Sequence, residues 1–207
     1  MGKFKDARKK ILQAAFEEIH LYSYHGSNVN RIANKSGVTK GAMYYYFKTK
    51  TDLGYAVVDE VIQRVVKETW FRPLEKCDDP IKCLQQIIRR SIRETTVEDI
   101  RLGMPLIDLS LEMSPLDEGF RKRFNLIQNN WLKIVTNSFT QGQKAGTVCD
   151  KIVARKSATQ ILAFLIGSIT LAKSTQSLKL FRDCQRRLIE HLILHPISDR
   201  LFEPPPI

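Results

Sequence analysis

Residues 29–47 read VNRIANKSGVTKGAMYYYF, and this stretch decides the fold. Its first half spaces apolar residues with a helical period, and Ser27 or Asn28 stands before it as the expected cap. Gly37 suits the positive φ of a tight turn, and Thr39 is placed to cap a second short helix. Two short helices joined by a tight turn form a helix-turn-helix, whose second helix enters the major groove of DNA.

The second helix of this stretch carries side chains suited to nucleic acid. Thr39 and Lys40 stand at its N-terminus, where free backbone N–H groups favour a phosphate. Gly41 lets another backbone come close, and Tyr44 and Tyr45 offer rings and hydroxyls to base methyl groups and phosphates. These positions predict a surface that contacts DNA.

An alternative interpretation makes the aromatic run 44–47 a core stripe. Neighbouring residues on a helix lie about 100° apart, so these consecutive rings cannot all face inward. We therefore expect Tyr45 to face DNA. Lys48 and Lys50 follow at positions suited to clamp the flanking phosphate backbone.

Charge supports this interpretation. The chain of 207 residues has a net charge of +11. Residues 1–50 hold 10 Lys/Arg and 3 Asp/Glu, a net +7, whereas the other 157 residues hold 23 and 19, a net +4. A basic first quarter is typical of a face that binds phosphates, although a solvated surface would carry the same charge. The same alternatives apply to the N-terminal cations Lys3, Lys5, Arg8, Lys9 and Lys10.

The rest of the chain also follows a helical period. No run alternates with period two between turn residues, which argues against a sheet. Further helices are expected near 5–24, 51–71, 80–97, 100–113, 116–145, 151–175 and 177–195. Pro73 is expected to end the helix before it, which predicts a domain boundary between residues 50 and 75. The length allows one large domain or two small ones.

The stretch 11–53, ILQAAFEEIHLYSYHGSNVNRIANKSGVTKGAMYYYFKTKTDL, resembles the DNA-binding domain of the TetR/AcrR family of bacterial regulators. The resemblance implies an all-α fold of about nine helices. A three-helix helix-turn-helix domain occupies residues 1–50 and is joined by a helix over 51–72 to a larger ligand-binding and dimerisation domain over 73–207. One departure is Ser23, where members of the family often have Gly before the aromatic residue.

The resemblance also implies which residues touch DNA. They lie at the start of the first short helix, along the second and just after it. The predicted contacts are Asn28, Val29, Thr39, Lys40, Gly41, Tyr44, Tyr45 and Lys48.

The resemblance continues more weakly into residues 103–108, which read GMPLID. Related C-terminal domains have Cys where this chain has Met104, so the thiolate that some relatives use to sense electrophiles is missing here. Large apolar side chains with few polar atoms are typical of ligand pockets, although ordinary core residues look the same. The predicted effector pocket consists of Met104, Leu109, Met113, Phe124, Trp131 and Phe164.

Residues 160–172, QILAFLIGSITLA, are apolar nearly all round. Such a helix needs cover on two faces, which favours a second copy of the chain across a two-fold axis; a central helix of a monomeric bundle is the alternative. The run is shorter than the roughly 20 residues that a membrane span needs. The predicted dimer interface comprises Phe164, Gly167, Ser168, Leu188 and Leu192.

No catalytic or nucleotide-binding motif is found, so we expect no enzyme and no cofactor. The pair His191 and His195 lacks a third ligand at suitable spacing, so no metal site is predicted. Cys77 and Cys83 flank a loop and are interpreted as small hydrophobes, with a redox-active pair as the alternative. The start of the chain shows no signal peptide, which favours a reduced, cytoplasmic setting.

The sequence therefore predicts a dimeric, ligand-responsive transcriptional regulator, most simply a repressor that a small-molecule effector releases from a pseudo-palindromic DNA operator. Its expected partners are operator DNA, an unknown small molecule and a second copy, without a membrane. Two other classes stay open. One is a helical small-molecule carrier or enzyme without DNA preference, and the other is an architectural DNA binder that ignores sequence.

Overall fold

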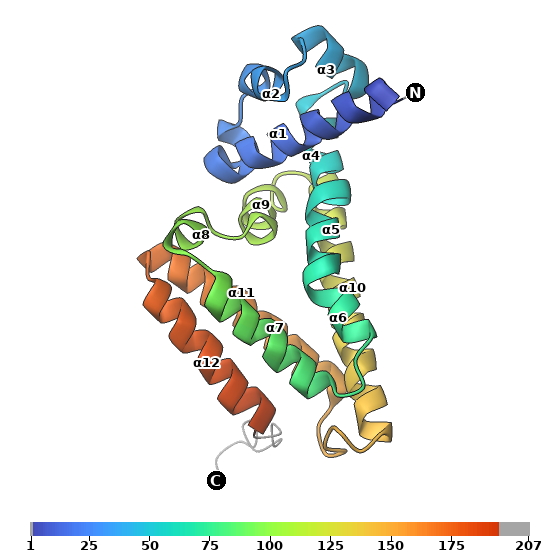
Figure 1. Ribbon diagram of the computed structural model, residues 1–207, viewed down its shortest axis with the longest axis vertical. Coiled ribbons are helices and arrows are strands. Elements are labelled where there is room, and N and C mark those ends of the chain that lie inside the picture. Colours follow the sequence, from blue (N-terminus) through green and yellow to red (C-terminus); the bar gives the residue numbers. More distant parts are fainter. Residues whose placement is uncertain (1, 195–207) are drawn as a thin grey trace. The chain divides into compact units, whose positions relative to one another are not determined.

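The computed structural model describes residues 2–194, with side chains for residues 6–190, and this part of the chain is helical and contains no strand (Figure 1). It divides into two compact units. One unit comprises Met1–Lys67 and Leu102–Gln128, and the other comprises Glu68–Arg101 and Asn129–Ile207.

The first unit gathers the N-terminal helices around a long helical stretch. Its helices are α1 (Gly2–Gly26), α2 (Val29–Ser36), α3 (Lys40–Tyr46), α9 (Pro105–Met113) and the first part of α10 (Glu118–Lys144). A long helical stretch begins in this unit with α4 (Lys50–Ala56), the π-helix η1 (Val57–Ile62) and α5 (Gln63–Val66), and it continues into the second unit as the π-helix η2 (Lys67–Phe71) and α6 (Arg72–Glu75). Residues 102–128 thus pack with the N-terminal helices, although they follow the domain boundary expected from the sequence.

Gly54 marks a close approach of three helices inside the first unit. A Cβ at this position would lie 2.7 Å from the Phe120 ring and 2.8 Å from the Tyr24 ring. The two rings also contact each other edge to face, with centroids 5.1 Å apart. Helices α1, α4 and α10 therefore meet here, and only a residue without a side chain lets them do so.

The second unit is built on α12 (Leu178–Leu194), which packs against both α7 (Pro80–Glu94) and α11 (Ala154–Thr175). Ile100, on α8 (Val97–Leu102), joins Ala172 and Phe181 in its apolar core. Trp70 and Trp131 contact each other in the same unit, with ring centroids 5.9 Å apart.

Two breaks differ from expectation. Pro73 does not end the helix before it, because the π turn of η2 places the proline in the first turn of α6, where its missing N–H costs least. Within the helix expected over 100–113, the Met104-Pro105 pair predicts a start or kink, and the structure has two helices there. Gly103 takes a φ of 80°, and Pro105 then begins α9.

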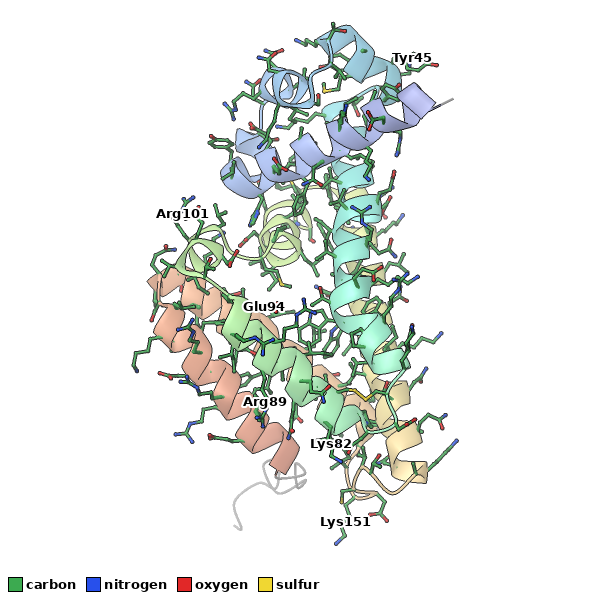
Figure 2. The ribbon with its side chains drawn as sticks, viewed as in Figure 1. Tyr45, Lys82, Arg89, Glu94, Arg101 and Lys151 are labelled. Atoms are coloured by element: carbon green, nitrogen blue, oxygen red, sulfur yellow. A yellow bond between two sulfur atoms is a disulfide. The ribbon has the colours of Figure 1, made fainter. Side chains whose placement is uncertain are left out.

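The structure also corrects the interpretation of two cysteines as small hydrophobes. Cys77 and Cys83 form a disulfide between the end of α6 and the first turn of α7 (Figure 2). Cys149 and Cys184 are free.

Candidate nucleic-acid interface

Side-chain caps and one glycine shape the helix-turn-helix. Asn28 Oδ1 accepts a hydrogen bond from the backbone N–H of Asn30 at 2.8 Å and so caps α2. Gly37 ends α2 with a φ of 70°, which side-chain-bearing residues rarely adopt. Thr39 Oγ1 accepts from the N–H of Ala42 at 3.1 Å and caps α3. These three devices confirm the turn predicted from the sequence.

Helix α3 has one face in the core and one in solvent. Met43 and Phe47 are buried, whereas Tyr45 is 69% exposed and Tyr44 is 37% exposed. Figure 2 shows Tyr45 projecting away from the helix. A Cβ on Gly41 would meet no atom within 4 Å. The core-stripe alternative for the aromatic run is therefore wrong for Tyr44 and Tyr45, whose open face can meet a partner.

Two exposed cations flank this face. Lys40 begins α3 and Lys48 follows it. Neither makes an ion pair or side-chain hydrogen bond with the described part of the chain, whereas the neighbouring Lys35 is paired with Glu17. Both ammonium groups are therefore available for phosphates. At the start of α2, Asn28 is exposed and Val29 is half-buried.

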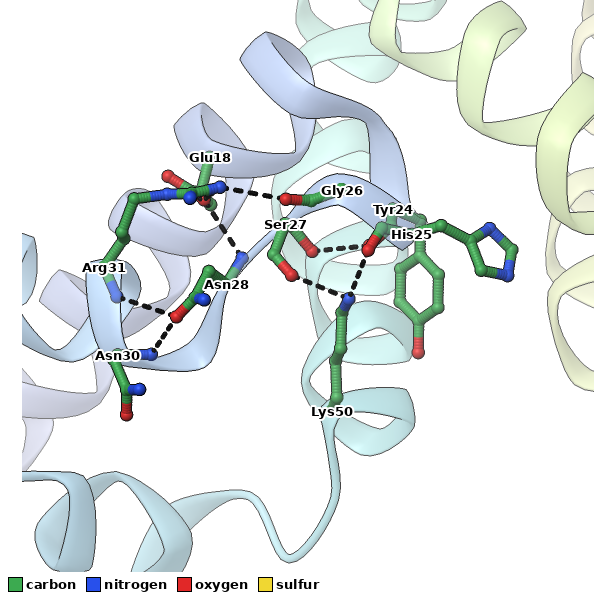
Figure 3. A network of polar contacts seen from close by, with 9 residues as sticks. All are labelled: Glu18, Tyr24, His25, Gly26, Ser27, Asn28, Asn30, Arg31 and Lys50. Carbon is green, nitrogen blue, oxygen red and sulfur yellow. Dashed lines mark hydrogen bonds and ion pairs between the residues drawn. The ribbon is translucent and has the colours of Figure 1, made fainter.

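A buried carboxylate braces the entry to α2 (Figure 3). Glu18 is buried, and its Oε1 accepts hydrogen bonds from the Asn28 backbone N–H at 3.0 Å and from Arg31 Nε at 2.6 Å. Arg31 also donates to the Gly26 carbonyl oxygen at 2.9 Å. This network ties α1 to α2 and engages the guanidinium of Arg31, although that side chain is exposed.

Lys50 also binds the connection between α1 and α2, and it does not face DNA. Its Nζ donates to the carbonyl oxygens of Ser27 at 2.8 Å and His25 at 3.3 Å (Figure 3). It also lies 4.8 Å from the centroid of the Tyr24 ring, and burial lowers the pKa of its ammonium group. The prediction that Lys50 clamps the phosphate backbone is wrong, because these carbonyl groups already hold it.

Sequence reasoning missed the group that holds the end of α1. Ser23 interrupts the helix with φ 63° and ψ 173°, so the N–H groups after it lose their helical partners. Glu112 on α9 accepts hydrogen bonds from the backbone N–H of Tyr24 at 2.7 Å and of His25 at 2.9 Å. Burial raises the pKa of Glu112, but these hydrogen bonds outweigh burial and leave that pKa lowered. One indication of this kink was present in the sequence, which is Ser23 at a position where related proteins often have glycine.

The basic N-terminal segment is partly engaged. Arg8 pairs with Glu60 of η1, and its guanidinium lies over the Phe47 ring at 5.2 Å. Lys10 pairs with Asp6. The predicted contacts Lys3 and Lys5 lie outside the side chains that the structure describes, and Lys9 is exposed.

The six predicted pocket residues are divided between the two units. Met104, Leu109, Met113 and Phe124 belong to the first unit, and Trp131 and Phe164 to the second. Leu109, Met113, Phe124 and Trp131 are buried, Met104 is half-buried, and Phe164 is 38% exposed on α11. Sequence reasoning missed Trp70 as the neighbour of Trp131.

The predicted dimer residues also separate into two groups. Ser168 and Leu188 are buried inside the second unit, where Gln185 Nε2 donates to Ser168 Oγ at 2.7 Å. Phe164 and Gly167 lie on the open side of α11. Leu192 lies outside the residues whose side chains are described. Ser168 and Leu188 are therefore internal packing residues, which corrects their predicted place on a dimer surface.

The described residues hold no cluster of His, Cys, Asp and Glu arranged for a metal ion, and His191 and His195 lie outside the described side chains. Helix α11 is long and apolar enough to pass a membrane-span test by length and composition, with 28% of its most apolar window buried. Core helices of soluble proteins pass the same test.

A capped helix-turn-helix with an exposed, basic and aromatic second helix, within a described chain that is otherwise helical, is the arrangement of a class of DNA-binding proteins. Residues 11–57 match the bacterial regulatory proteins of the tetR family, and residues 80–187 match the C-terminal domain of LmrA/YxaF-like transcriptional regulators. The protein belongs to the TetR family of transcriptional regulators.

Individual proteins agree with the family match. The HTH-type transcriptional regulator LmrA of Bacillus subtilis is 28% identical over 176 residues, which cover 84% of this chain and 90% of that protein. A TetR-family regulator from Cytophaga hutchinsonii has the same fold, with a TM-score of 0.82, 17% identity, and coverage of 96% of this chain and 99% of that one. The Bacillus subtilis regulator FadR in complex with stearoyl-CoA gives a TM-score of 0.68 at 20% identity and covers 89% and 97% of the two chains.

Proposed function

We propose that the protein is a repressor that binds a pseudo-palindromic operator as a homodimer. The observation that carries this proposal is the open face of α3, where Tyr44, Tyr45 and Lys40 stand exposed on a helix whose other side is buried. Two such helices, one from each copy, would enter successive major grooves about 34–36 Å apart. The eight predicted DNA contacts stay proposals, with Arg31 and Lys50 assigned to holding the joint.

The open side of α11 supports the dimer. Phe164, Gly167 and Leu171 recur at helical spacing along it, and Leu171 is 53% exposed. Removing a large apolar side chain from water is favourable, so the same stripe of a second copy is a suitable partner for this surface. The open glycine allows close approach of the two helices. This stripe replaces Ser168 and Leu188 in the proposed interface.

We infer that a small-molecule effector binds in the C-terminal domain near Trp131. Trp70 stands beside it on the π-helix η2, and π-helical turns often mark functional sites. In the same unit, buried polar atoms of Thr136 and Gln160 have no hydrogen-bond partner within the described residues. A ligand with both apolar and polar groups would satisfy them. Met104, Leu109, Met113 and Phe124 stay candidates, while the exposure of Phe164 favours the dimer stripe.

The effector would act by preferring the conformation that does not bind DNA. A preference of about 1–3 kcal/mol weakens DNA binding roughly 5–150-fold. Helix α9 is a suitable relay inside the first unit because it packs against α1 and because Glu112 holds the end of α1. No cofactor, metal or catalysis is needed, and the protein acts where its DNA is, in the cytoplasm.

Capture of genomic fragments from the source organism by the purified protein, at stated near-physiological salt, tests this function. Enrichment of one or a few palindromes is the expected result. Uniform retention of all fragments with a steep salt dependence would instead identify an architectural DNA binder. Retention of none, together with tight binding or turnover of a small molecule, would identify a carrier or an enzyme.

The two tryptophans offer a second readout. They are the only two in the chain, and they contact each other, so their fluorescence reports on one place in the C-terminal domain. Effectors that release the operator are expected to change this fluorescence over the same concentration range. A Trp131→Phe variant is expected to lose most of that signal.

A further inference from the structure

The disulfide between Cys77 and Cys83 joins two helices at a short connection in the second unit. Cys77 is the second residue after α6, and Cys83 stands in the first turn of α7. The Cα atoms lie 6.5 Å apart, which is within the ordinary range for a disulfide. Lys82 precedes Cys83, projecting from the first turn of α7 (Figure 2).

The redox setting makes this bond unusual. A DNA-binding regulator works in a compartment where glutathione and thioredoxin keep thiols reduced, and disulfides found there are mostly transient or redox-sensing. A chain of this length also has enough core to fold without a staple. We propose that Cys77 and Cys83 form a reversible thiol–disulfide switch, oxidised by a peroxide or a low-molecular-weight disulfide, whose state sets operator affinity.

Accessibility and local charge suit this chemistry. Both sulfurs belong to half-buried residues at a surface connection, so small oxidants and reductants can reach them. Cys83 lies in the first turn of a 15-residue helix, where backbone N–H groups favour a thiolate. The nearby Asp79 carboxylate is paired with Lys82 at 3.1 Å, which offsets its repulsion of that thiolate. Cys77 Sγ lies 3.2 Å from the Asp79 carbonyl oxygen, where a reduced thiol can donate.

The proposed oxidation balances with hydrogen peroxide as the oxidant. The Cys83 thiolate attacks one peroxide oxygen, the O–O bond breaks, and the departing hydroxide takes a proton to leave as water, giving a sulfenic acid on Cys83. The Cys77 thiol then attacks that sulfur, the S–S bond forms, and a second water leaves with the Cys77 proton. Two molecules of glutathione reverse the change and become one glutathione disulfide.

The bond lies at a corner of the second unit that packing and polar contacts also hold. On one side, the connection meets the loop after α10, where Thr147 Oγ1 donates to the Asp78 carbonyl oxygen at 3.5 Å. A Cβ on Gly142 would lie 2.9 Å from Pro80, so this corner is closely packed. Reduction removes the covalent link between Cys77 and α7, which lets residues 77 and 78 relax while Asp79 still caps α7 through the Lys82 backbone N–H. Because α6 ends the continuous helical stretch that starts just after α3, we expect the change to alter DNA binding, an inference that rests on the proposed function.

The test uses the full chain with Cys149→Ser and Cys184→Ser, which leaves only the proposed pair. The protein is equilibrated in glutathione buffers of stepped ratio, quenched with acid and alkylated. Intact mass counts the labelled thiols, and anisotropy measures affinity for the captured operator at fixed salt. We expect the count to change from two to zero in one step and operator affinity to change about five-fold or more over the same step.

The control adds Cys77→Ser to the same background, and its operator affinity should not respond to the glutathione ratio. Thiols that stay labelled in the most oxidising buffer or after peroxide overturn the switch, as does a full change in thiol count at constant operator affinity. Failure of the proposed function is distinguishable: neither redox form then binds any genomic fragment with sequence preference. In that case the proposed function fails, and the claim that the Cys77–Cys83 pair controls operator affinity fails with it.

Discussion

The carboxylate of Glu112 holds the kinked end of helix α1 at His25: Oε1 lies 2.9 Å from the backbone nitrogen of His25 and 2.7 Å from its Nδ1. The N–H of Tyr24 donates to the other carboxylate oxygen at 2.7 Å. This relationship joins residues 87 positions apart in sequence and fixes the end of α1 immediately before the helix-turn-helix. Its consequences can be measured.

Replacing Glu112 with Ala should destabilise the protein. The N–H groups of Tyr24 and His25 would lose their acceptor, and hydrogen bonds to a charged group contribute about 1.5–3 kcal/mol each at most. We expect a loss of about 1–3 kcal/mol in the free energy of unfolding, measured with urea. Glu94→Ala, which breaks an exposed pair with Arg90, is the control and should cost less than about 1 kcal/mol. Equal losses for both variants would contradict the role of Glu112.

The same carboxylate should make stability depend on pH. The pKa of Glu112 is lowered in the folded protein, so its contribution is present above the unfolded-state value and is lost as the pH falls through the folded-state value. The stability difference between wild type and Glu112→Gln should therefore be largest near neutral pH and shrink below about pH 4. Unfolding by urea at a series of pH values measures this difference. A difference that grows toward acid pH would contradict this account.

Ser23→Gly should stabilise the protein. Ser23 adopts φ 63° and ψ 173°, a region that is nearly reserved for glycine and costs of order 1–3 kcal/mol for other residues. Glycine removes that strain, but it also has more conformational freedom in the unfolded chain. We therefore expect the free energy of unfolding to rise by about 1 kcal/mol. Thermal unfolding of Ser23→Gly beside Ser174→Gly, an exposed position in α11, measures it. Loss of stability at both positions would show that Ser23 is not strained.

Lys40→Ala should weaken DNA binding through phosphate contacts. Removing one contact to a phosphate reduces the slope of log affinity against log salt by about 0.9, so a dimer without two of them should show a reduction of about 1.8. Binding to operator and unrelated DNA should weaken alike, because phosphate contacts carry no sequence information. Lys133→Ala, an exposed lysine on α10, is the control and should leave the slope unchanged. An unchanged slope for Lys40→Ala would remove this lysine from the interface.

Leu171→Glu should dissociate the proposed dimer. The leucine is 53% exposed on the open side of α11, and a carboxylate there would be buried without a partner in the interface. Leu126→Glu is a matched control, because Leu126 is 55% exposed on α10. Sedimentation should find monomers of Leu171→Glu and dimers of the control at the same concentration. Dimers of both would place the interface elsewhere.

Local features of the helix-turn-helix were predictable because their partners are close in sequence. Asn28 and Thr39 accept hydrogen bonds from backbone N–H groups two or three residues later in the chain. Gly37 adopts a positive φ, which a glycine does without steric cost. Helical spacing alone predicted that the aromatic run 44–47 could not all face inward, and Tyr45 is exposed.

Tertiary partners were not predictable from one sequence. Lys50 has the charge and position of a phosphate contact, and only the folded chain brings it to the carbonyl group of Ser27, 23 residues earlier. Ser168 suits a helix interface, yet which face of α11 meets α12 depends on packing. The bond between Cys77 and Cys83 depends on how α6 leads into α7, which the helix pattern did not resolve.

The central claim is that Tyr45 on α3 reads operator sequence, and the specificity ratio of Tyr45→Ala tests it most directly. The ratio compares dissociation constants for the captured operator and a scrambled fragment at one salt concentration. One base contact contributes about 1–3 kcal/mol of discrimination, so two half-sites predict a fall of at least about ten-fold, with dimer and thermal stability unchanged. Leu21→Ala, an exposed apolar residue on α1, should keep the wild-type ratio. An unchanged ratio for Tyr45→Ala, or an equal fall for both variants, would contradict the account.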